Sequence, residues 1–364
     1  MAVKGTLDKV ISVMVGIISI ILPRYFSESN KKYSLNLALE HYGFGNPKQK
    51  QAIEDLFAQS SIIPKDSSLN AAFPERLTKD EVIKDIIYIL KETQKKFVVR
   101  SGVQERWETE ALEWMTQNKL KTYENLKILG FVDAVAPKHT TTDALCILGA
   151  TASRMAGRID YASSLIKDGL KTKAIILLTG ERYVTKNIDG SEIELIQIAN
   201  KYNLTDWTKL NETHIIKDLY DKSDLKNSNL AVHVIDTPKG NLPRPTTQTT
   251  VLDLIKWLKT HDDIQNITFV SNQPNVPYQS AIIDSIFKDQ HVDIKYEVVG
   301  NESANIEELR LIIEGFGSYI WAATPSVLLE MHLQLTDLSI KESLKELYSK
   351  NPLLYNTLPD IFSE

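Results

Sequence analysis

The chain is poor in cysteine and has no surplus of basic residues. Its single cysteine, Cys146, excludes a disulfide framework within the chain and a cysteine-rich metal site. Because Cys146 lies inside the apolar run Ala144–Leu148, its thiol is predicted to be a small core side chain rather than a nucleophile. The 42 lysines and arginines face 47 aspartates and glutamates, and the resulting net charge of -5 argues against nucleic-acid binding.

Motifs of the common catalytic and nucleotide-binding sites are also missing. The chain contains no G-x-x-x-x-G-K-[ST] phosphate loop and no G-x-G-x-x-G dinucleotide fingerprint. It lacks a G-x-S-x-G nucleophile elbow and an H-E-x-x-H metal motif. Any reaction of this protein therefore has no familiar sequence signature, and its cofactor cannot be assigned from a motif.

Long hydrophobic runs are scarce, and the best of them lies in the N-terminal segment, residues 1–29. The stretch Val10–Leu22 is uncharged and follows Lys4 and Lys9. As a helix it would measure about 20 Å, shorter than a bilayer core of about 30 Å. It fits either a signal-peptide core or a buried or membrane-surface helix. The cellular location therefore stays open between the cytoplasm and export to the envelope, with membrane contact through residues 10–22.

A helical region is predicted over residues 30–140. Asn46 and Pro47 are typical of a helix start, and Thr78 with Glu81 forms a capping box. Apolar residues at helical spacing follow both starts. Packing alone accounts for this pattern.

Between residues 141 and 303 short apolar runs of strand length alternate with segments of helical length. The runs are Ala144–Leu148, Ala174–Leu178, Ala231–Ile235, Ile267–Val270 and Ile294–Val299. The helical segments are Met155–Asp168, Glu192–Lys201, Thr250–Lys259 and Gln279–Lys288. This alternation predicts a Rossmann-like α/β domain with a parallel sheet of about five strands and helices on both faces. Residues 304–364 are predicted to be a helical extension packed on the core.

Each predicted strand runs into a polar loop. In open α/β sheets ligands bind beyond the carboxyl ends of the strands, where guanidinium groups and helix N-termini favour anions. We therefore predict a site for a small anionic molecule at this edge. The predicted ligand-binding residues are Gly149, Arg154, Arg158, Thr179, Gly180, Arg182, Thr237, Arg244, Thr246, Thr247, Thr250, Ser271, Asn272, Gln273, Tyr278, Gln279 and Asn301.

Structural roles are the alternative for several of these residues. Thr246 or Thr247 can simply cap a helix, and Arg158 can pair with Asp160 or another surface carboxylate. If the site is catalytic, the acid–base candidates are three carboxylates at strand ends. These are Glu181, Asp236 and Glu302.

A second polar cluster precedes the sheet. It consists of Arg100, Arg106, Trp107 and Glu108. The cluster fits either a helix start anchored by the tryptophan or a cap over the predicted site.

The order of these segments resembles the SanA/YdcF-like family of bacterial proteins. The segments that carry the resemblance are Leu148-Gly149 with Arg154 and Arg158, Leu178-Thr179-Gly180-Glu181, Thr246–Thr250, and Val270-Ser271-Asn272-Gln273 with Tyr278-Gln279. The resemblance covers about residues 143–300 and implies a Rossmann-like fold with a ligand cleft. It also implies a link to the bacterial envelope and a nucleoside-type cofactor such as S-adenosylmethionine.

Two functions follow from these observations. The first is an enzyme acting on a phosphorylated or nucleotide-like small molecule, which the arginines and threonines at the strand ends favour. The second is a binding or interaction protein without turnover, which the missing catalytic motifs favour.

Overall fold

The computed structural model describes residues 33–99, 105, 109–303, 305–331, 342, 344 and 346. The N-terminal segment 1–29 and its stretch Val10–Leu22 lie outside the described residues, as do Arg100, Arg106, Trp107 and Glu108. Within the described ranges, no helix is both long and apolar enough to cross a lipid bilayer.

The first part of the chain is helical. Its helices are α2 (Leu35–His41), α3 (Pro47–Gln59), α4 (Leu69–Ala72), α5 (Lys79–Thr93), the π-helical turn η1 (Gln94–Val98), α6 (Glu113–Gln117) and α7 (Lys119–Ile128). The expected capping box at Thr78 begins α5, and the helix start expected at Asn46 is also a capping box, which begins α3. The caps fix where these helices begin because they satisfy backbone N–H groups that the first turn leaves open.

The second part is an α/β domain with five parallel strands. The strands are β1 (Ala144–Leu148), β2 (Ala174–Gly180), β3 (Ala231–Thr237), β4 (Asn266–Asn272) and β5 (Lys295–Asn301). The connecting helices are α8 (Ala152–Lys167), α9 (Glu192–Lys201), α10 (Glu212–Lys222), α11 (Thr247–Leu258) and α12 (Val276–Asp289). The predicted fold class is therefore confirmed.

Strand β1 lies at the centre of the sheet, in the order β3-β2-β1-β4-β5. Ala144 is level with Ala174 of β2 on one side and with Ile267 of β4 on the other. The chain runs outward from β1 to β3 and then returns to the other side of β1 to form β4 and β5. The strand order thus reverses between β1 and β4, the position where open α/β sheets form a ligand crevice.

Helices cover both faces of the sheet. On one face Leu145 and Ile147 of β1 pack with Met155 and Ile159 of α8. On the other face Cys146 packs in a core built with α11 and α12, and burial raises the pKa of its thiol. Cys146 is thus a core residue, in keeping with its position in an apolar strand.

Strand β3 forms one edge of the sheet, and β5 forms the other. Val232 and Val234 are 37% and 41% exposed, although the sequence run is as apolar as those of the buried strands. An apolar run predicts that a strand is buried, but it does not show where the strand lies in the sheet. The strand order decides which strands lie at the edges and are therefore less covered.

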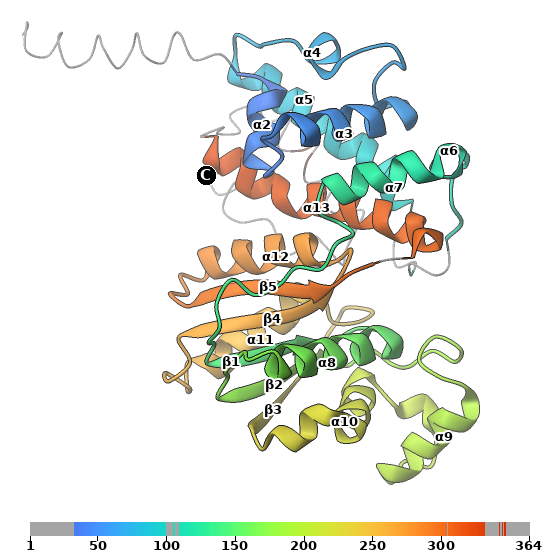
Figure 1. Ribbon diagram of the computed structural model, residues 1–364, viewed down its shortest axis with the longest axis vertical. Helices are drawn as coiled ribbons and strands as arrows, with labels where there is room; N and C mark the ends of the chain where they lie inside the picture. The colour runs from blue at the N-terminus through green and yellow to red at the C-terminus, as the bar shows by residue number, and fades with distance from the viewer. Residues whose placement is uncertain are drawn as a thin grey trace, which may run out of the picture.

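The C-terminal helix α13 (Leu309–Glu330) joins the two parts. It shares one hydrophobic core with the N-terminal helices, through Ile312, Phe316 and Trp321, and its Ala322 belongs to the core of the sheet domain. In Figure 1, α13 lies between the N-terminal helices and α12. Gly315 allows this close approach, because a Cβ there would lie 2.8 Å from the Pro274 side chain.

Candidate functional site

A cavity of about 580 Å³ lies beyond the carboxyl ends of β1 and β2. Its walls come from the β1–α8 loop, α8, the β3–α11 loop, the start of α12 and the start of α13. Residues from α8 and α12 face each other across the point where the strand order reverses. The volume falls within the range of about 300–1,000 Å³ that small-molecule sites occupy.

Many of the predicted ligand-binding residues line this cavity. They are Gly149, Arg154, Arg158, Arg182, Arg244, Thr246, Thr247, Thr250, Tyr278 and Gln279. The structure therefore brings together the β1–α8 loop, the β2 end, the β3–α11 loop and the α12 start.

Helix α8 begins at the cavity. Among the described side chains none caps it at Thr151, and Asp189 Oδ1 accepts a hydrogen bond from the N–H of Ala152, the first residue of the helix, at 3.0 Å. Ser153 and Arg154 in the first turn line the cavity. A helix N-terminus with open N–H groups attracts negative charge through hydrogen bonds and the helix dipole.

Arg158 ties the ends of β1 and β4 together. Its Nη1 donates to the carbonyl oxygens of Leu148 and Gly149, each at 2.7 Å, and its Nε donates to Asn272 Oδ1 at 2.9 Å. The side chain is only 2% exposed and does not form the pair with Asp160 that the sequence allowed. Arg158 positions the loop that carries the cavity wall, besides adding positive charge to it.

Arg182 is held in an ion-pair network at the end of β2. Its guanidinium bonds both carboxylate oxygens of Asp189 at 2.9 Å, Glu212 Oε2 at 3.1 Å and the carbonyl of Ala150 at 2.9 Å. Burial lowers the pKa of Arg182, but the hydrogen bond and charge of Asp189, with the charge of Glu212, raise it more. The net result is a permanently charged side chain with a fixed orientation.

Glu212, the first residue of α10, places a carboxylate in the cavity wall. Burial raises the pKa of Glu212, and the nearby charges of Arg182, Arg244 and Arg158 lower it by less. Gly149 makes room for this carboxylate, since a Cβ at Gly149 would lie 1.9 Å from Glu212 Oε1. A small loop residue is therefore required beneath Glu212.

Glu212 was not among the predicted site residues, because helix α10 was not predicted from the sequence. A usable signal was present: Asn211 caps the helix, and Ile215, Ile216 and Leu219 follow at helical spacing. Only the packing of α10 against α8 and β2 brings its first residue to the end of β1.

Three of the described cavity-lining residues come from the helical part of the molecule, namely Glu105, Arg310 and Leu311. Glu105 and Arg244 both line the cavity and form an ion pair, with Glu105 Oε1 2.7 Å from Arg244 Nε. Arg310, in the first turn of α13, bonds Thr109 Oγ1 at 2.5 Å and Glu314 Oε2 at 3.3 Å. No sequence pattern marked Arg310, because a charged residue at the start of an amphipathic helix is commonly a surface residue.

Thr246 acts as the N-cap of α11, as the structural alternative proposed. Its hydroxyl accepts from the Thr249 N–H at 3.3 Å, and Thr249 bonds back to the Thr246 N–H at 2.9 Å. Thr250 Oγ1 donates to the Thr247 carbonyl at 3.0 Å. The threonines thus shape the cavity wall while satisfying the helix start.

Other predicted ligand-binding residues lie outside the cavity lining. They are Thr179, Gly180, Thr237, Ser271, Asn272, Gln273 and Asn301. Thr179 bonds Thr213 at 2.7 Å, and Gln273 donates to the carbonyls of Gly130 and Asp133 at 2.9 Å. Successive side chains of a strand point to opposite faces, so only some residues of each strand end can face one cavity.

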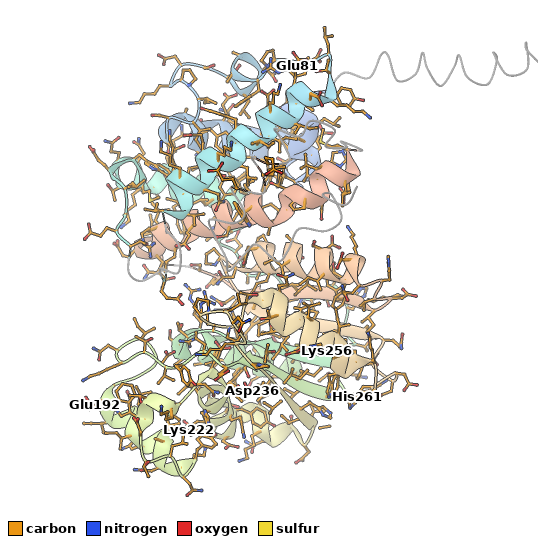
Figure 2. All side chains as sticks on the ribbon, turned by 180° about the vertical axis from the view of Figure 1, so that it is seen from behind. Glu81, Glu192, Lys222, Asp236, Lys256 and His261 are labelled. Carbon is orange, nitrogen blue, oxygen red and sulfur yellow. The ribbon has the colours of Figure 1, made fainter. Side chains whose placement is uncertain are left out.

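The three predicted acid–base carboxylates also lie outside the lining. Glu181 accepts from the Lys239 N–H at 3.2 Å and the Tyr183 hydroxyl at 3.0 Å, which lower its pKa. Asp236 is exposed on the edge strand β3 (Figure 2), and Glu302 is exposed after the edge strand β5. In the described part of the chain, the carboxylates that line the cavity are Glu105 and Glu212.

Comparison with known proteins yields little. No protein-family model matches this chain, and no curated protein matches it. Among solved structures, the chain is similar to FtsY from Mycoplasma mycoides, with 13% identity and a TM-score of 0.24, over 76% of this chain and 87% of that chain. A similarity at this level carries no argument about the cavity, and the resemblance to the SanA/YdcF-like family stays a prediction.

Proposed function

We propose that the cavity binds a small anionic molecule of the phosphorylated or nucleotide-like kind. The observation that carries this proposal is the charge of the lining. Among the described residues, five arginines line the cavity against two glutamates, in a protein whose net charge is -5. The arginines are Arg154, Arg158, Arg182, Arg244 and Arg310.

The surroundings of the arginines support the same proposal. Carboxylates hold the guanidinium groups of Arg182, Arg244 and Arg310 in place, so little side-chain entropy is lost when a ligand binds. The N-terminus of α8 lies at the cavity beside Ser153 and Arg154, where the helix dipole favours negative charge. A charge-assisted hydrogen bond contributes about 1.5–3 kcal/mol, so a few of them suffice for micromolar affinity.

The test is calorimetric titration of the full chain with inorganic phosphate, AMP and S-adenosylmethionine. We expect at least one phosphorylated compound to bind, and R154Q or R244Q to weaken it by about tenfold or more, in line with the loss of one charge-assisted bond. The matched control is K256Q, which removes a charge on the exposed face of α11 (Figure 2) and should leave the affinity unchanged. Failure of every phosphorylated compound to bind the wild type would reject the proposal.

A binding role without turnover is the second candidate. It is favoured by the position of Glu181, Asp236 and Glu302, because none of these predicted acid–base groups lines the cavity. It includes the envelope association that the N-terminal segment 1–29 and the family resemblance suggest. Conversion of a bound compound by the purified protein, measured by chromatography of the mixture, would exclude it.

A further inference from the structure

Glu212 carries an oxygen atom whose hydrogen-bonding capacity is unused within the described part of the chain. The residue is 8% exposed and lines the cavity. Its Oε2 accepts from Arg182 Nε at 3.1 Å, whereas Oε1 receives no hydrogen bond from the described residues. Oε1 lies over the backbone of Gly149, which itself forms part of the cavity wall.

Several elements hold this carboxylate in place. Asn211 caps α10 through the His214 N–H, which fixes the helix start. The Glu212 N–H donates to the Arg182 carbonyl at 2.9 Å, and the side chains of the same two residues form an ion pair. Oε1 is accessible from the cavity rather than fully buried. The fold therefore holds Glu212 with one acceptor oxygen open to a ligand.

An anion site alone does not account for this position. The carboxylate of Glu212 lies close enough to Arg182, Arg244 and Arg158 for their charges to act on its pKa. A bare anion bound by these arginines would be repelled by Glu212, since like charges in a low-dielectric cavity repel strongly. A ligand that carries a hydrogen-bond donor beside its anionic group would instead satisfy Glu212 and the arginines together.

We infer that Glu212 forms a second subsite, which accepts a hydrogen bond from a hydroxyl group of a sugar phosphate or nucleotide. The inference rests on the proposed function and deepens it, because it selects hydroxylated phosphates over simple phosphate. The cavity volume of about 580 Å³ leaves room for a sugar in addition to a phosphate. Its apolar lining residues, such as Leu178, Ile188 and Pro245, suit the carbon skeleton of such a ligand.

The test compares inorganic phosphate with ribose 5-phosphate by calorimetric titration of the full chain. We expect the wild type to bind ribose 5-phosphate at least about tenfold more tightly than phosphate, as one good hydrogen bond provides. In E212A the affinity for ribose 5-phosphate should fall by about tenfold, while that for phosphate stays equal or rises because a like charge is gone. E212M keeps about the length of the side chain but removes the carboxylate acceptor, and it should show the same change in preference if E212A does not fold.

The matched control is E192Q on the exposed helix α9 (Figure 2), which should change neither affinity. If E212A and E212M weaken both compounds equally, or if the wild type does not prefer ribose 5-phosphate, the Glu212 subsite is rejected while the anion site stands. If neither compound binds the wild type, the proposed function fails and the subsite fails with it. Tighter binding of phosphoethanolamine than of ribose 5-phosphate would show that Glu212 prefers an ammonium group to a hydroxyl group, and it would overturn the assignment.

Discussion

Arg182 donates two parallel hydrogen bonds to Asp189, from Nη1 to Oδ2 and from Nη2 to Oδ1, each 2.9 Å long. Asp189 also accepts the backbone N–H groups of Thr185 at 2.8 Å and Ala152 at 3.0 Å. The carboxylate thus connects the β2–α9 loop to the first turn of α8. This pair fixes the orientation of an arginine in the cavity wall.

D189N is expected to destabilise the protein by about 1–3 kcal/mol, because Arg182 loses one of its two carboxylate partners while Glu212 remains. Urea unfolding followed by circular dichroism measures the change. The matched control is D224N, because Asp224 forms an exposed pair with Lys167, and it should leave the midpoint nearly unchanged. Equal midpoints for D189N and D224N would show that the Arg182 pair contributes little.

E212Q is expected to raise the melting temperature at about pH 8, with a difference that shrinks toward about pH 4. Burial raises the pKa of Glu212 above its ordinary 4.5, by more than the arginines lower it. The folded protein therefore binds this proton more tightly than the unfolded chain, and ionisation of Glu212 destabilises the fold as the pH rises. Scanning calorimetry across this range tests the sign, and a lower melting temperature for E212Q at about pH 8 would contradict it.

G149A is expected to destabilise the protein by about 1–3 kcal/mol, since its Cβ would overlap Glu212 Oε1 at 1.9 Å. The control is G157A in the interior of α8, where the nearest atom to a new Cβ is 3.9 Å away. This second change should stabilise by about 0.5–1 kcal/mol, as expected for replacing a helical glycine by alanine. Chemical denaturation measures the free energy of unfolding of both variants. An unchanged free energy of unfolding for G149A would mean that the Glu212 side chain moves aside at little cost.

G315A is expected to weaken the packing of α13 against the β4–α12 loop. A Cβ at Gly315 would lie 2.8 Å from Pro274 Cβ and 2.9 Å from its backbone oxygen, so the helix has to shift. We expect a loss of about 1–3 kcal/mol and faster hydrogen exchange in α12. G45A, with its nearest neighbour at 3.5 Å, serves as the control and should leave the exchange of α12 unchanged.

Much of the fold could be predicted from the sequence. Apolar runs such as Ala144–Leu148 form strands wherever they occur in an alternating pattern, and the helix starts at Asn46 and Thr78 lie where local capping chemistry places them. Local rules also predicted the polar strand ends, because parallel strands end at one edge of a sheet. The arginines of the cavity wall at positions 154, 158, 182 and 244 were among the residues expected there.

Only the tertiary structure decided which of these residues share a cavity and which do not. The strand order places β3 and β5 at the edges, and Asp236 and Glu302 at their ends do not line the cavity. Packing of α10 on β2 brings Glu212 over Gly149, and α13 brings Arg310 from the far end of the chain. These placements depend on contacts between residues distant in sequence, which local pattern and propensity do not encode.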